Sequence, residues 1–177
     1  MKLFIRQSFT QADKSQSNVI QGVIDLIKAL FPQTNFLTGE HASCSASFIE
    51  NFEATTGLIF TPKAFRNYRL GLINEADALL FIRTSMSESG SFELSYNLHT
   101  DNPKPVFYAH WRYAPIKTTL LKELDQEFPV RYCEFVRPEE LSEDFAAFVK
   151  KYQLSGKDPM STDMPAEQDG VLIAETV

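Results

Sequence analysis

The sequence has only two cysteines, no long apolar run and no excess of basic residues, and each absence narrows the function. Cys44 and Cys133 lie in unrelated segments without C-x-x-C spacing, which argues against a disulfide framework and a zinc site. We therefore expect a protein of a reducing compartment that carries no metal or other cofactor. The net charge of −6 argues against nucleic acid as a partner, because binding to its phosphate backbone requires a basic face. A small anionic ligand needs only a few local arginine or lysine side chains.

The amino-terminal segment "MKLFIRQSFTQ" is too short and too polar for a secretory signal, and no apolar run has the length of a transmembrane helix. The sequence therefore predicts a soluble, cytoplasmic protein without a membrane partner. Hydrophobic residues make up 44% of the chain and include fifteen phenylalanines, which is enough for one domain with a sizeable core. We predict a domain at residues 1–152 and a polar tail at 153–177, where Ser, Pro, Gly and Asp replace the core pattern.

Apolar runs with strand composition alternate with segments of helical periodicity along the predicted domain. The expected strands are residues 2–7, 34–38, 76–82, 106–111 and 130–136. One expected helix begins after a cap at Ser17. The other expected helices span residues 62–75, 91–100, 116–127 and 142–152. Residues 39–61 are harder to interpret, and a helix and a short strand are both open for parts of them. The alternation predicts an α/β fold, a three-layer sandwich with a five-stranded parallel sheet of the flavodoxin or Rossmann type.

Open parallel sheets bind ligands at the carboxyl ends of their strands, near the point where the strand order reverses. Three such ends carry polar residues: the segments 8–10, 83–91 and 110–112. Arg83 also fits a surface position, and Trp111 also fits a core or interface position. We predict a binding site at this edge of the sheet, with these candidate ligand contacts: Ser8, Phe9, Arg83, Ser85, Ser89, Gly90, Ser91, His110 and Trp111.

Glu93 is the candidate working carboxylate of this edge, because a helix is expected to begin near Ser91. In the first turn of a helix, free N–H groups and the helix dipole stabilise a negative charge by about 0.3–1 kcal/mol. An ionised carboxylate suits a nucleophile or a group that stabilises an oxocarbenium ion. The flanking Ser89 and Gly90 offer backbone N–H groups to a phosphate or a sugar hydroxyl. The same residues also fit an ordinary solvated loop and a glutamate that only stabilises its helix.

The segment "INEADALLFIRTSMSESGSFELSYNLHTDNPKPVFYA" (residues 73–109) resembles the core of the nucleoside 2-deoxyribosyltransferase-like superfamily. It shares a strand preceded by Ala-Asp, a short loop, a Gly/Ser-rich turn that ends in a glutamate, and Lys-Pro before the next strand. Deoxyribonucleotide N-hydrolases and cytokinin-activating phosphoribohydrolases have related architecture. The segment "KLFIRQSFT" (residues 2–10) is similar to the opening strand and ligand loop of the superfamily.

Enzymes of this superfamily cleave the N-glycosidic bond of nucleosides or nucleotides, and in the transferases a glutamate attacks C1′ of the sugar. The resemblance implies that Glu93 is this nucleophile and that the turn at 89–91 binds the sugar or its phosphate. Ser8 and Phe9 match the loop that contacts the base. The resemblance also implies a homodimer or a higher homo-oligomer.

The sequence departs from the transferase pattern at Arg69, where an acidic residue usually helps to protonate the leaving base. A guanidinium group cannot act as a general acid near neutral pH, but it can hold a phosphate or a carboxylate. This departure favours a nucleotide over a free nucleoside. The phosphoribohydrolases pair an arginine of this helix with the later glutamate, a part that the resemblance gives to Arg66 or Arg69. Asp77, the third catalytic candidate beside Glu93 and Arg69, also fits a residue that caps or pairs at the amino end of its strand.

The sequence thus predicts an enzyme that hydrolyses an N-glycosidic bond or transfers a deoxyribosyl group, with Glu93 as nucleophile. The expected partners are a small-molecule nucleoside or nucleotide and further copies of the chain. Two alternatives stay open. One is a non-catalytic domain that binds a nucleotide or a nucleotide-derived signal in the same pocket. The other is an interaction protein whose acidic tail docks a partner.

Overall fold

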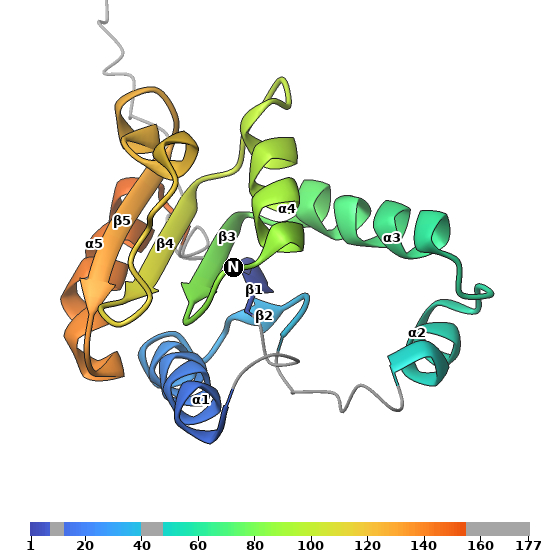
Figure 1. Ribbon diagram of the computed structural model, residues 1–177, viewed down its shortest axis with the longest axis horizontal. Helices are drawn as coiled ribbons and strands as arrows, with labels where there is room; N and C mark the ends of the chain where they lie inside the picture. The colour runs from blue at the N-terminus through green and yellow to red at the C-terminus, as the bar shows by residue number, and fades with distance from the viewer. Residues whose placement is uncertain (8–12, 40–47, 155–177) are drawn as a thin grey trace, which may run out of the picture.

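The computed structural model describes residues 1–7, 13–39 and 48–154, so the predictions for Ser8, Phe9 and the tail beyond Leu154 lie outside the described residues. Strands and helices alternate along the chain (Figure 1). The strands are β1 (Lys2–Arg6), β2 (Asn35–Phe36), β3 (Ala78–Arg83), β4 (Val106–Trp111) and β5 (Val130–Phe135). The α-helices are α1 (Lys14–Leu30), α2 (Phe48–Thr56), α3 (Pro62–Glu75), α4 (Glu88–Leu98) and α5 (Ser142–Lys151). The short 3-10 helices are η3 (Thr119–Leu121), η4 (Leu124–Gln126) and η5 (Pro138–Leu141).

The described strands form one sheet in the order β2-β1-β3-β4-β5. Every neighbouring pair is parallel, from Lys2 beside Asn35 at one edge to Trp111 beside Phe135 at the other. The chain therefore extends the sheet from β1 in one direction to β2, and then in the opposite direction through β3, β4 and β5. This topology confirms the predicted α/β fold with a five-stranded parallel sheet.

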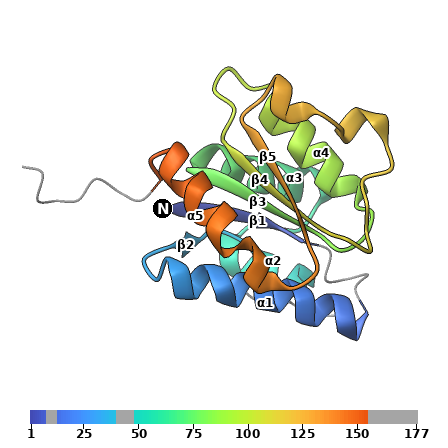
Figure 2. The ribbon, with the colours of Figure 1, turned by 90° about the vertical axis from the view of Figure 1, so that its left-hand side faces the viewer.

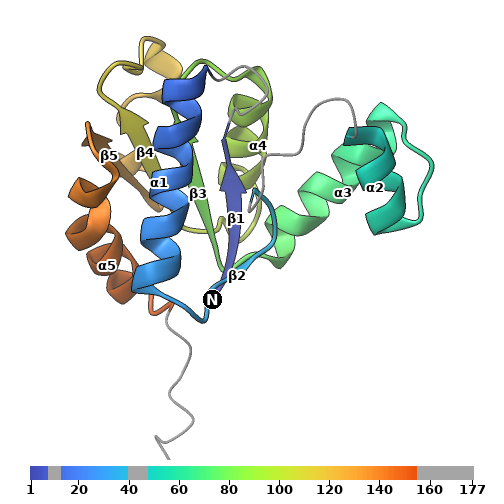
Figure 3. The same cartoon turned by 90° about the horizontal axis from the view of Figure 1, so that it is seen from below.

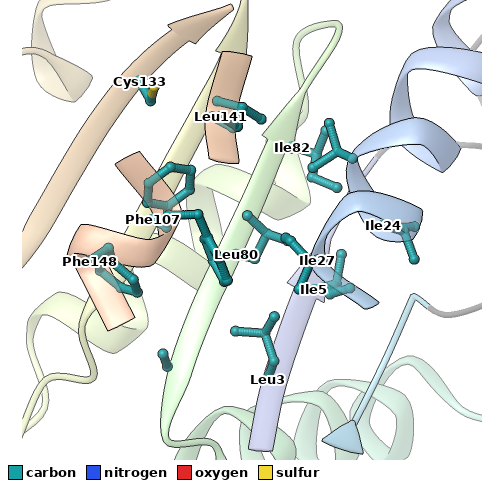
Figure 4. Packing of buried hydrophobic residues seen from close by; sticks show 14 of the residues in the cluster. Leu3, Ile5, Ile24, Ile27, Leu80, Ile82, Phe107, Cys133, Leu141 and Phe148 are labelled. Carbon is teal, nitrogen blue, oxygen red and sulfur yellow. The ribbon is translucent and has the colours of Figure 1, made fainter. Parts of the chain in front are cut away.

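Helices cover both faces of the sheet, which gives the three predicted layers (Figure 2). Helices α1 and α5 pack on one face over a core that includes Leu3, Ile5, Leu80, Ile82 and Phe107 (Figure 4). Helices α3 and α4 pack on the other face over a core that includes Phe4, Leu79, Phe81, Val106 and Tyr108. Successive side chains of a strand point to opposite faces, so both cores draw on the same apolar runs.

Two helix starts show how side chains fix the boundaries. Asp13 Oδ1 accepts a hydrogen bond from Gln16 N at 2.8 Å, and Gln16 Oε1 accepts one from Asp13 N at 3.0 Å. This capping box starts α1 before the predicted Ser17 cap. Helix α3 begins as predicted, because Thr61 caps it and Pro62 occupies its first position. None of the helices in the described parts of the chain is long and apolar enough to cross a membrane.

The helix predicted from Ile116 to Glu127 is wrong. The segment contains the two short 3-10 helices η3 and η4. Glu123 between them has a left-handed backbone conformation (φ 59°), which a continuous right-handed helix cannot contain. The hydroxyl of Tyr132 donates a hydrogen bond to the carbonyl oxygen of Leu121, which therefore bonds to the sheet rather than to a next helical turn.

Residues 48–61, which the sequence leaves open, contain α2 and a loop but no strand. The rings of Phe48 and Phe52 lie with their centroids 5.0–5.8 Å from those of Phe60 and Phe65. This aromatic cluster packs α2 against the beginning of α3. The two helices together extend sideways from the sheet (Figure 3).

Candidate functional site

A pocket lies where the sheet topology predicts a ligand site. The strand order reverses between β1 and β3, and ligands of open parallel sheets bind outside the carboxyl ends at such a point. The pocket is partly open, and its free space of about 290 Å³ includes open solvent. It is lined by Arg6, Gln7, Phe81, Ile82, Arg83, Ser85, Ser87, Gly90, Ser91 and Tyr108.

Three neighbouring strands each contribute one side chain to the same wall of the pocket. Arg6 on β1 lies in register with Phe81 on β3, which lies in register with Tyr108 on β4. The rings of Phe81 and Tyr108 stack with centroids 5.6 Å apart and planes 8° from parallel. Burial raises the pKa of Tyr108, and Arg83 lowers it in part, so the phenol keeps its proton at neutral pH. This wall combines an aromatic surface with a hydrogen-bond donor.

Glu93 on α4 is almost fully buried, with 7% of its side chain exposed, and its carboxylate contacts two arginines. Arg69 Nε on α3 donates a hydrogen bond to Glu93 Oε1 at 2.8 Å. Arg6 Nε lies 3.3 Å from Glu93 Oε2, but neither of these two buried atoms makes a hydrogen bond. Glu93 does not line the pocket, whereas Arg6 lines it and also contacts Glu93. Of the two α3 arginines considered in the sequence, Arg69 is the one that contacts Glu93.

The prediction that Glu93 lies in the first turn of its helix is wrong. Ser87 caps α4 by accepting a hydrogen bond from Gly90 N at 3.1 Å, so the helix begins at Glu88 rather than near Ser91. Glu93 is the sixth residue of the helix, and the effect of the helix end is confined to its first turn. Two guanidinium groups, rather than the helix end, lie beside this carboxylate.

Arg6 connects Glu93 to the beginning of α4. Its Nη2 donates hydrogen bonds to Ser87 Oγ at 3.0 Å and to Ser89 Oγ. Burial lowers the pKa of the Arg6 guanidinium, Glu93 raises it and Arg69 lowers it, and the group remains a cation at neutral pH. The cluster of Arg6, Arg69 and Glu93 therefore carries two positive charges and one negative charge beside the pocket.

Gly90 allows the Ser87 side chain to lie close to the first turn of α4. A Cβ atom at position 90 would lie 3.1 Å from Ser87 Oγ and 3.5 Å from Arg6 Nε. Next to this contact, Ser85 Oγ is buried at the pocket wall without a hydrogen-bond partner. A guanidinium group and several hydroxyl groups are a donor set that suits a phosphate or a sugar. Within the described residues, no group of three or more His, Cys, Asp or Glu side chains is placed to hold a metal ion.

Two sequence candidates lie away from this cluster. Asp77 lies at the opposite, amino edge of the sheet, where its Oδ2 accepts a hydrogen bond from Lys2 N at 2.6 Å. Trp111 packs against the core under α1 and α5, and its Nε1 donates a hydrogen bond to Val136 O at 3.1 Å. The structure therefore does not bring either side chain to Glu93.

Arg83 and His110 lie at the carboxyl ends of β3 and β4. Arg83 lines the pocket, but its Nε and Nη2 donate hydrogen bonds to the carbonyl oxygens of Ala114 and Pro115 at 3.1 and 3.3 Å. His110 does not line the pocket, and its Nδ1 is buried without a hydrogen bond. Burial lowers the pKa of His110, with Glu134 opposing that shift and Arg83 adding to it. Arg83 therefore fixes the loop after β4, and His110 is a neutral residue that is not part of the pocket lining.

Arg6, Ser87 and Tyr108 also line the pocket but are not among the residues predicted from the sequence. Arg6 ends a short strand, a position that suits an ordinary surface arginine, and Tyr108 lies inside an apolar run. The alternation of side chains along each strand indicates the positions of Arg6 and Tyr108. Arg6 shares a face of the sheet with Phe4, and Tyr108 shares the same face with Val106. Ser87 stands three residues before Gly90, and it competes with Ser91 for the cap of α4.

No protein-family model and no curated protein sequence matches this chain. Among solved structures, the chain is similar to the CMP N-glycosidase BcmB of Clostridium botulinum, with 14% identity, a TM-score of 0.55, and 84% of this chain and 99% of that chain covered. An azoreductase from Bacillus anthracis str. Sterne matches with 11% identity, a TM-score of 0.39, and 86% and 97% of the two chains covered. At 14% identity, the likeness to BcmB shows a common α/β fold and no more.

Proposed function

We propose that this protein binds a nucleoside 5′-monophosphate in the pocket between β1 and β3 and cleaves its N-glycosidic bond with Glu93 as nucleophile. One observation carries this proposal. The Glu93 carboxylate is buried and held at Oε1 by Arg69, while Oε2 lacks a hydrogen-bond donor and lies 3.3 Å from the pocket-lining Arg6. The motif at residues 73–109 and the fold in common with a CMP N-glycosidase support the same chemistry.

In the proposed reaction, Glu93 Oε2 attacks C1′ of the ribose, and a C1′–O bond forms as the C1′–N bond breaks. The electron pair of the broken bond stays on the base, which takes up a proton from solvent. Water then attacks C1′, the bond to Oε2 breaks, and a proton returns to solvent. The products are the free base and ribose 5-phosphate, and Glu93 is again a carboxylate. A second base in place of water turns the same sequence into a transfer.

The surrounding residues have separate parts in this proposal. The Arg69 guanidinium does not release a proton near neutral pH, so it cannot act as a general acid. We assign to it the positioning of Glu93. Tyr108 keeps its phenolic proton and donates a hydrogen bond to the bound nucleotide, while its ring and Phe81 form the apolar wall. Arg6 and the hydroxyl groups of the first turn of α4 bind the phosphate.

Incubation of the full chain with CMP, UMP, AMP, GMP and IMP, and with the matching nucleosides, tests the proposal when free base is measured by chromatography. We expect free base from at least one monophosphate, and a loss on the order of 10³-fold or more in the Glu93→Gln variant. Glu75→Gln is the matched control, because Glu75 is half exposed and pairs with Lys2 at the amino edge of the sheet. Absence of free base with every substrate contradicts the enzymatic proposal.

A non-catalytic nucleotide-binding domain is the second candidate, and the position of Glu93 favours it. The carboxylate does not line the pocket, and each of its oxygens faces an arginine nitrogen. For such a domain, calorimetry detects binding of a monophosphate while chromatography detects no free base. The same two measurements therefore separate the two candidates.

A further inference from the structure

We infer that Arg6 makes the phosphate group of the substrate a requirement for reaction at Glu93, an inference that rests on the proposed function of the pocket. Arg6 has two sets of contacts. Its Nε faces Glu93 Oε2 at 3.3 Å, and its Nη2 donates to the hydroxyl groups of Ser87 and Ser89. Arg6 both lines the pocket and contacts the carboxylate, so we assign to it the part of a specificity-determining and positioning residue.

The contact between Arg6 and Glu93 is an ion pair without a hydrogen bond. Arg6 Nε and Glu93 Oε2 are both buried, and neither has a hydrogen-bond partner. Buried polar atoms without partners are unfavourable, so a rearrangement that gives Arg6 a better acceptor is favoured. Glu93 Oε1, in contrast, has a well-formed hydrogen bond from Arg69 at 2.8 Å. Arg6 is therefore the partner that shifts, and Arg69 is the partner that stays.

A phosphate supplies the better acceptor. Charged phosphate oxygens bind a guanidinium more strongly than neutral serine hydroxyls do. The hydroxyl of Ser85 is buried at the pocket wall without a partner, and that of Ser87 also lines the pocket, so both can donate to phosphate oxygens. The cluster of two arginines and one glutamate has one positive charge in excess, which attracts a phosphate dianion and gives no such advantage to a neutral nucleoside.

The shift of Arg6 changes the reactivity of Glu93. Once Arg6 binds the phosphate, Oε2 loses the cation beside it while Arg69 still fixes Oε1. In a nucleoside complex, Arg6 keeps its place beside Oε2, and its charge draws electron density from the attacking atom. A monophosphate is therefore expected to exceed its nucleoside in kcat as well as in KM. In the Arg6→Met variant, the ratio of the two kcat values falls by about tenfold or more.

A binding cycle tests this coupling without turnover. Isothermal titration calorimetry measures the affinity of inorganic phosphate for the full-length wild-type chain, for Glu93→Gln, for Arg6→Met and for the double variant. We expect Glu93→Gln to bind phosphate at least about fivefold more tightly, because the carboxylate no longer competes for Arg6. Arg6→Met is expected to weaken binding at least about tenfold. The double variant is expected to bind phosphate with the same affinity as Arg6→Met alone.

Three results overturn the inference: no binding of phosphate to the wild type, unchanged affinity in Arg6→Met, or an equal effect of Glu93→Gln with and without Arg6. Arg6→Lys is a second variant that keeps the charge but loses the planar fork, and it is expected to recover binding in part. Lys2→Met and Glu75→Gln remove charges from an exposed pair at the amino edge of the sheet, and both should leave the phosphate affinity unchanged. These outcomes are independent of base release, so failure of the inference and failure of the proposed function are distinguishable.

Discussion

Arg69 on α3 donates a hydrogen bond to Glu93 on α4 at 2.8 Å, and the carbon of its guanidinium lies 4.4 Å from the centre of the Phe4 ring. The arginine is thus held between a carboxylate and an aromatic face of the sheet. This pair connects two helices on one face to the first strand, so the candidate site is also part of the packing of the domain.

Loss of the Arg69 side chain is expected to destabilise the fold. Arg69→Met leaves Glu93 buried with only the weaker contact to Arg6, and we expect the free energy of unfolding to fall by about 2 kcal/mol. Urea denaturation measures this change. Arg66→Met on the exposed side of α3 is the control and should shift the same quantity by less than about 0.5 kcal/mol. Equal effects of the two substitutions would show that the Arg69–Glu93 pair does not contribute to stability.

Two glycines in helices give a matched pair that tests the packing of Ser87 on the first turn of α4. Gly71→Ala on α3 adds a methyl group where no atom lies within 4 Å, and it is expected to raise the free energy of unfolding by up to about 1 kcal/mol. Gly90→Ala places the same group 3.1 Å from Ser87 Oγ, and it is expected to gain less stability and to weaken phosphate binding. Denaturation and calorimetry measure the two effects. If both variants gain the same stability and bind phosphate equally, the packing at Gly90 has no role in the site.

Cys133 is expected to resist thiol reagents in the folded protein. Burial raises its pKa to about 12, and its Sγ donates a hydrogen bond to Asp144 Oδ2 at 3.0 Å, so the thiolate is scarce at pH 8. In a Cys44→Ser variant, a disulfide reagent should label no thiol in buffer and one thiol in urea. Fast labelling in buffer would contradict the burial of this thiol.

The same thiol predicts that stability falls in alkali. The unfolded chain releases the Cys133 proton above about pH 8.5, whereas the folded chain keeps it until the pH approaches about 12. The contribution of Cys133 to the free energy of unfolding is therefore complete below about pH 8.5, and it decreases as the pH rises from about 8.5 to about 12. Urea denaturation between pH 7 and pH 10 measures the decrease, which should be smaller in Cys133→Ala. Parallel pH profiles for the two proteins would contradict this origin of the alkaline loss.

The strands and the layers can be predicted from the sequence, because a continuous apolar run such as Ala78–Ile82 is typical of a strand that is buried on both faces of a sheet. Residues 116–127 show the limit of such patterns. Leu120 and Leu124 recur at a helical spacing, but the hydrogen bond from Tyr132 to Leu121 and the backbone of Glu123 favour two short 3-10 turns. Contacts between distant segments decide this region, and a local pattern does not contain them.

Only part of the candidate site can be predicted from the sequence, because the rest depends on contacts between distant segments. Glu93 and the turn at 89–91 stand in one recognisable segment, so their motif is visible in the sequence. Arg6 lies 81 residues before Ser87, and only the pairing of β1 with β3 brings the two side chains within 3.0 Å. The first-turn prediction for Glu93 was wrong because Ser87 and Ser91 both fit a cap, and the contact of Ser87 with Arg6 favours the earlier one.

A trapping experiment tests the role of Glu93 most directly. A nucleoside monophosphate with fluorine at C2′ of its sugar slows the second step of a covalent mechanism, because the fluorine destabilises the oxocarbenium-like transition state. Mass spectrometry of the intact chain should then show one added glycosyl phosphate, and peptide mapping should locate it on Glu93, with no adduct in Glu93→Gln. Release of base from ordinary monophosphates without an adduct at Glu93, or with one on another residue, would contradict nucleophilic attack by this carboxylate.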